Sequence, residues 1–115
     1  MTTTSRPAAI ATEQIRNDRT VVTEWRFPPG AETGWHTHGH DYVVVPTTGG
    51  ELLLETPEGE RRVPLAPGQS YTRPGGTPHN VINPTPHEVA LIEIDLPPPA
   101  PNTRRAQSLT HPLAP

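Results

Sequence analysis

The sequence predicts an all-β fold, an antiparallel sandwich or barrel of roughly eight short strands. Seventeen prolines and nine glycines interrupt the 115-residue chain every few residues, so no run in the middle of the sequence is left for a substantial helix. The apolar residues are concentrated between Thr20 and Leu96. In that span, short runs of apolar and β-branched residues alternate with turn residues. We therefore predict a single barrel domain at residues 20–96.

The strands of this domain can be placed in order. Residues 20–27 alternate, with Val21, Thr23, Trp25 and Phe27 on one face, and Pro28-Pro29-Gly30 ends this first strand. Gly- and Pro-containing turns separate the further strands that we expect, at residues 42–45, 51–56, 61–65, 70–73, 79–82 and 87–96. Pro64 has no backbone N–H to donate to a neighbouring strand, so we expect its strand to lie at the edge of a sheet or to be irregular.

The last of these strands has a polar face. Glu93 and Asp95 alternate with Ile92 and Ile94. An antiparallel sheet commonly has one solvated face, so we interpret the two acidic residues as solvent-exposed.

The two ends of the chain differ from the domain. Residues 1–19 are polar, and we expect an N-terminal arm that can contain a strand and contact a neighbouring subunit. Residues 97–115 begin with a proline-rich run and offer too little apolar surface to offset the entropy of ordering. We predict an extended or disordered tail there.

Composition excludes several classes of partner and site. The net charge is -3, and the nine basic residues, all arginines, are scattered, which argues against nucleic acid as a partner. The chain has no cysteine, so a metal would be held by imidazole, carboxylate, phenolate or water. No apolar run approaches the ~20 residues of a membrane span, and the first ten residues lack a signal-peptide core. We expect a cytoplasmic protein without membrane contact.

Two groups of residues, each with a characteristic spacing, indicate metal binding. Gly30 is followed by His36-Thr37-His38, and in an extended strand side chains at i and i+2 share a face, so two imidazoles can reach one point inside a barrel. The second group runs from Gly68 through Pro74 and Gly76 to His79 and Asn83. It supplies a third imidazole from a distant part of the chain.

Together the two groups resemble the two motifs of the cupin superfamily, over residues 20–96. Residues 30–49 look like the first motif and residues 68–83 like the second. The run from Gly34 to Pro46 is similar to small stand-alone cupins known as β-alanine degradation proteins. The resemblance implies a double-sheet jelly-roll barrel with His36, His38 and His79 as metal ligands.

The sequence departs from the cupin pattern at Tyr42, where the family usually has a glutamate ligand. Tyr42 either binds through its phenolate or hydrogen-bonds a metal-bound water, and we favour the second role because a free phenol has a pKa of ~10. His40 completes a set of four nitrogens if the strand continues past Gly39. Asp41 serves only if the connection is one residue tighter.

Three neutral imidazoles suit a divalent transition metal, and Fe, Zn, Ni, Mn and Cu are all compatible. Similarity to three-histidine cupins favours Fe(II) and an O2-dependent oxidoreductase that acts on a small organic acid or chelating metabolite. The alternatives are a redox-inert isomerase or lyase and a non-catalytic binding module.

Further expectations concern the pocket and the assembly. Arg73 can bind a substrate carboxylate, the alternative being a surface salt bridge, and Trp35 can form part of the substrate pocket, the alternative being core packing. We also expect a homodimer, because so small a barrel leaves apolar sheet surface to cover.

Overall fold

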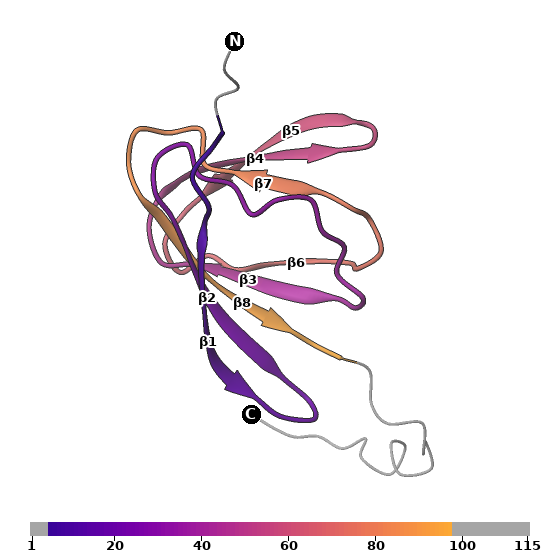
Figure 1. Cartoon of the computed structure of the whole chain (residues 1–115). Coiled ribbons are helices and arrows are strands. Elements are labelled where there is room, and N and C mark those ends of the chain that lie inside the picture. The colour runs from indigo at the N-terminus through magenta and orange to yellow at the C-terminus, as the bar shows by residue number, and fades with distance from the viewer. Residues whose placement is uncertain (1–4, 98–115) are drawn as a thin grey trace.

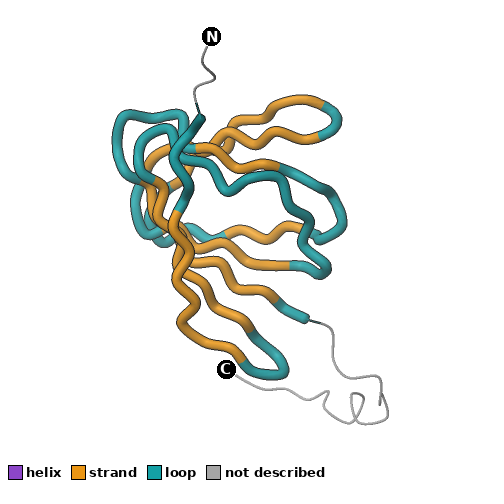
Figure 2. The backbone as a smooth tube through the Cα atoms, viewed as in Figure 1, coloured by secondary structure: helices purple, strands orange, loops and turns teal. Residues whose placement is uncertain are grey.

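The computed structural model describes residues 5–97, and in this range the chain forms eight strands and no helix (Figures 1 and 2). The strands are β1 (Ile10–Arg16), β2 (Val21–Phe27), β3 (Tyr42–Pro46), β4 (Gly50–Thr56), β5 (Gly59–Leu65), β6 (Tyr71–Arg73), β7 (Asn80–Ile82) and β8 (Val89–Asp95). They make a five-stranded sheet in the order β1-β2-β8-β3-β6 and a three-stranded sheet in the order β5-β4-β7. All pairings are antiparallel, which confirms the predicted double-sheet β architecture.

Each strand expected within residues 20–96 is present, with ends that differ by a few residues. Pro64 lies in β5, which is an edge strand of the smaller sheet, as its missing N–H donor predicts. In the segment expected as an N-terminal arm, β1 pairs with β2 along the edge of the larger sheet. The predicted tail, apart from Pro97, lies outside the described residues.

The hydrophobic core fills the space between the inner faces of the two sheets. Phe27 of β2, Val44 of β3 and Leu91 of β8 face Leu52 and Val63 of the smaller sheet. Phe27, Val44, Leu52 and Leu91 also line an internal cavity together with polar side chains. Residues 5–97 include no helix that could cross a lipid bilayer.

Candidate metal centre

The two histidine-containing loops are joined through their backbones. The amide of His36 donates to the carbonyl of His79 at 2.9 Å, and the amide of His79 donates back to His36 at 2.9 Å. This isolated antiparallel bridge is one of several backbone links between the segments that resemble the first and second cupin motifs, another being the bridge between Glu32 and Ile82. Gly75 permits the close approach, because a Cβ at this position would lie 2.6 Å from the carbonyl oxygen of His40.

Two asparagines hold the loops in place. Asn83 is fully buried, and its side-chain amide donates to the carbonyls of Phe27, Pro28 and His87, at 2.9, 3.3 and 2.7 Å. Asn80 accepts a hydrogen bond from the amide of Gly34 at 2.9 Å. Asn83, which ends the second motif, therefore has a structural role in this chain, because its amide joins three backbone segments.

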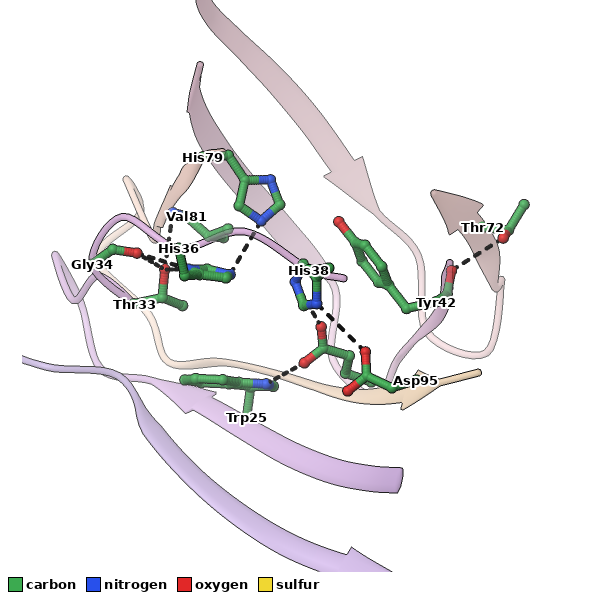
Figure 3. A network of polar contacts seen from close by, with 11 residues as sticks. Trp25, Thr33, Gly34, His36, His38, Tyr42, Thr72, His79, Val81 and Asp95 are labelled. Carbon is green, nitrogen blue, oxygen red and sulfur yellow. Dashed lines mark hydrogen bonds and ion pairs between the residues drawn. The ribbon is translucent and has the colours of Figure 1, made fainter. Parts of the chain in front are cut away.

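His36, His38 and His79 converge on one point inside the barrel (Figure 3). One ring nitrogen of each lies within 4.8 Å of the others, and the Nε2 atoms of His36 and His79 are 3.2 Å apart. The sequence predicted this convergence from the alternation of side chains in an extended strand, and that reason was only partly right. Residues 32–41 form no continuous strand, and the bridge to His79 rather than strand alternation holds His36 in position.

The tautomer of His36 follows from its neighbours. Its Nδ1 lies 2.8 Å from the carbonyl oxygen of Gly34, which can only accept. Nδ1 therefore carries the proton, and the lone pair of Nε2 faces His79. A backbone carbonyl that fixes the ring in this way is a common arrangement behind a metal-ligating histidine.

His38 lies between an aromatic ring and two acids. It stacks on Tyr42 with ring centroids 4.0 Å apart, its Nε2 is 3.2 Å from Glu93 Oε2, and its Nδ1 is 3.4 Å from Asp95 Oδ1. Burial, followed by the nearby His36, lowers the pKa of His38. Burial and the neighbouring His36 also lower the pKa of His79 to about 4. Histidines of this kind are neutral at pH 7 and able to bind a cation.

The interpretation of Glu93 and Asp95 as solvent-exposed was wrong. Glu93 is 8% exposed, and its Oε1 accepts a hydrogen bond from Trp25 Nε1 at 2.8 Å. Burial raises the pKa of Glu93 to about 7. Asp95 Oδ1 is buried with no hydrogen-bond partner. The inward orientation of Glu93 could have been inferred from its position in the sheet, because Glu93 shares a strand face with Leu91 and pairs with Val44.

A narrow cavity of about 50 Å³ lies beside the histidines, and a wider groove of about 350 Å³ opens at its mouth. Tyr42 and Arg73 line both, as do Leu54, His38 and His79. Burial raises the pKa of Tyr42 to about 12, so its phenol keeps the proton at neutral pH. Arg73 lies over the ring of Tyr71, with Cζ 5.0 Å from the ring centroid, and forms no ion pair with any residue in 5–97.

Three expected site residues lie elsewhere. The chain bends at Gly39 and His40, which breaks the alternation, and His40 is not part of the histidine cluster. Asp41 is exposed and accepts a hydrogen bond from the amide of Gly75. Trp35 is 56% exposed and lines neither cavity, because it precedes the inward-facing His36 and points outward.

The donor set fits a divalent transition metal. Three imidazole nitrogens converge, and the tautomer of one of them, His36, is fixed by its hydrogen bond to Gly34. Next to His38, the buried Oδ1 of Asp95 has no hydrogen-bond partner. Imidazole is a ligand for Fe, Zn, Ni and Cu alike, so the nitrogen donors leave the identity of the metal open.

Comparisons with known proteins agree with this geometry. The cupin domain family Cupin_2 matches residues 23–95. The chain is 60% identical, over 79% of its length and 96% of the relative's, to the β-alanine degradation protein BauB of Pseudomonas aeruginosa. A crystal structure of a cupin domain from Bordetella pertussis superposes with a TM-score of 0.81 at 59% identity, covering 84% of this chain and all of that one. A sugar phosphate isomerase of the cupin superfamily from Silicibacter pomeroyi gives a TM-score of 0.54 at 26% identity, covering 71% of this chain and 53% of that one. This chain belongs to the cupin family.

Proposed function

We propose that this cupin is a metal-dependent oxidoreductase that acts on a small organic acid. The observation that carries the proposal is the convergence of His36, His38 and His79 beside a cavity whose mouth holds an arginine without an acidic partner among residues 5–97. A bound Fe(II) would bind dioxygen and pass to it electrons that come from the oxidised substrate, and His36, His38 and His79 as the protein ligands would leave room for a chelating substrate.

Arg73 is suited to bind a carboxylate of that substrate. Its guanidinium lies against Tyr71, which orients it, and it reaches both the narrow cavity and the groove. A guanidinium binds a carboxylate through two parallel hydrogen bonds and so sets the substrate's direction. The name of the Pseudomonas relative refers to β-alanine, a three-carbon amino acid with a carboxylate, which is the size and class of molecule that this site would accept.

The remaining wall of the cavity is largely apolar and supplies one hydrogen-bond donor. Leu54, Val81 and Leu91 give it an apolar lining, which strengthens electrostatic interactions inside it. Tyr42 contributes a neutral phenol O–H that can donate a hydrogen bond to a developing negative charge on the substrate. A cytoplasmic location and the exclusion of nucleic acid as a partner stay predictions.

The test is oxygen consumption by Fe(II)-loaded protein with a panel of short carboxylic acids and their amino and thiol derivatives. Arg73→Met should raise KM for the active acid by at least tenfold. Arg62→Met is the matched control, because Arg62 is an exposed arginine paired with Glu51 on the outside of the smaller sheet.

Product formed without oxygen by Zn(II)-loaded protein would instead indicate a redox-inert isomerase or lyase. Thermal stabilisation by an acid that is never converted would indicate a binding module.

A further inference from the structure

A second arginine lines the groove at the mouth of the cavity. Arg61 of β5 lines the wider groove but not the narrow cavity, whereas Arg73 of β6 lines both. Strand β5 belongs to the smaller sheet and β6 to the larger one, so the two arginines come from opposite sheets (Figure 1). Arg73 therefore lies where the groove meets the narrow cavity, and Arg61 lies farther from the histidines.

The strand pattern turns Arg61 toward the inside of the barrel. In β5 the side chains of Val63 and Leu65 are buried, and by alternation Arg61 shares their face. Arg61 also pairs with Leu54 of β4, which lines both the cavity and the groove. Arg61 itself is exposed, so its guanidinium is accessible to a ligand that enters from solution.

Arg61 has no ion-pair partner among residues 5–97. Its neighbour Arg62, on the outer face of the same strand, is paired with a glutamate at 3.0 Å. Glu58 and Glu60 also line the groove, but neither forms an ion pair with Arg61 or Arg73. Glu60 alternates with Arg61 and starts from the outer face, and Glu58 lies in the turn before β5. The groove therefore presents two arginines without an acidic partner in the described part of the chain.

We propose that Arg61 binds a second acidic group of the substrate, so that the preferred substrate is a short dicarboxylic acid. The inference rests on the proposed function, in which Arg73 binds the first carboxylate. Arg73 holds that carboxylate close to the histidines, and Arg61 holds the other from the opposite wall of the groove. Each guanidinium binds its carboxylate through paired hydrogen bonds, and two fixed ends set the direction of the molecule.

Acids of equal chain length with one or two carboxylates test the assignment. Malonate, succinate and glutarate, and their partners propionate, butyrate and pentanoate, are titrated calorimetrically into Zn(II)-loaded protein, which measures binding without reaction with dioxygen. The wild type should bind at least one dicarboxylate roughly tenfold more tightly than its partner, because hydrogen bonds between charged groups contribute about that factor.

Three variants separate the two arginines. Arg61→Met should weaken dicarboxylate binding by roughly tenfold and leave monocarboxylate binding unchanged, while Arg73→Met should weaken both. Arg62→Met is the matched control and should keep the wild-type affinities, because Arg62 lies on the outer face of the same strand. If Arg61→Met does not fold, Arg61→Lys replaces it. That variant keeps the charge but not the paired hydrogen bonds, so it should also reduce the preference for the dicarboxylate.

The outcomes distinguish failure of this inference from failure of the proposed function. A wild type that binds both acids of every pair equally overturns the assignment of Arg61 alone. An Arg61→Met variant that keeps the preference for the dicarboxylate, or weakens both acids alike, does the same. Tighter binding of β-alanine than of malonate would also contradict the assignment, because a glutamate of the groove would then bind an ammonium group. A wild type that takes up no Zn(II), or binds none of the acids, overturns the proposed function and this inference with it.

Discussion

In the C-terminal half of β8 the two faces differ in the direction opposite to the usual one, whereas in its N-terminal half the inner face carries the buried Val89 and Leu91. In the C-terminal half the inner face carries Glu93 and Asp95, which contact a histidine, and the outer face carries Ile92 and Ile94. An ordinary antiparallel strand would turn the isoleucines inward and the acids to water. The two acids are therefore buried next to His38, where they contact its imidazole.

The outer face of the larger sheet has a corresponding apolar row. The strand registers align Ile15 with Val22, Val22 with Ile94, and Ile94 with Val43, so one row of side chains crosses four strands. Ile15 is 50% exposed. Such a row on the outside of a barrel is suited to contact with a second copy of the chain, and this is the surface on which we base the predicted homodimer.

The largest expected effect on stability comes from the inner face of β8. Leu91→Ala should lower the free energy of unfolding by about 2–5 kcal/mol, because Leu91 is buried in the core. The adjacent Ile92→Ala should cost only about 1 kcal/mol, because Ile92 is half-buried on the outer face. Denaturant unfolding of both variants measures the difference, and equal costs would mean that the two faces are not distinct.

A second prediction concerns the buried acid in metal-free protein. With a pKa of about 7 in the fold and 4.5 outside it, Glu93 stabilises the fold fully only below pH 4.5, and this contribution is lost as the pH rises through 7. Glu93→Gln should therefore exceed the wild type in stability by about 3 kcal/mol at pH 8 but by less than about 1 kcal/mol at pH 5. Unfolding curves at the two pH values test this, and a gain independent of pH would argue against ionisation of Glu93 in the fold.

A third prediction concerns the loss of the Tyr42 hydroxyl, which should reduce metal affinity or activity without abolishing metal binding. Tyr42→Phe keeps the ring that stacks on His38 and removes the hydroxyl, so the metal should be retained with about a 10- to 100-fold loss of affinity or activity. A ferric-loaded wild type with a visible phenolate charge-transfer band that disappears in Tyr42→Phe would show that the phenolate is a direct ligand. That result would contradict the role as a neutral donor.

The smallest change in the stability of the folded chain is expected on the outer face. Ile94→Arg should convert a dimer to a monomer in sedimentation while metal binding is unchanged, because the side chain points away from the site. Gln69→Arg, in an exposed turn, is the control and should leave the dimer intact. A wild type that sediments as a monomer would contradict the homodimer prediction.

Much of the fold was predictable, because alternation and turn residues are local signals. They located the seven strands of residues 20–96, and the donor lost at Pro64 indicated an edge. The convergence of His36 and His79 was predictable from motif spacing, although the bridge that produces it is a contact between distant segments.

The face of β8 that points inward was not predictable from the strand itself. Alternation separates Glu93 and Ile94 but does not say which is inside. That choice depends on the pairing of β8 with β2 and β3, which places Glu93 beside Val44 and Thr23. The bend at Gly39 and His40 likewise removes the regular geometry on which ligation by His40 depended.

The most direct test of the histidine centre is elemental analysis of untagged protein purified without added metal. The account predicts close to one transition metal ion per chain in the wild type and nearly none in His36→Ala. His87→Ala is the control, because the side chain of His87 is exposed and outside the cluster, and it should match the wild type. Equal metal content in all three proteins, or a wild type that holds no metal and takes up none on titration, would contradict a metal site at His36, His38 and His79.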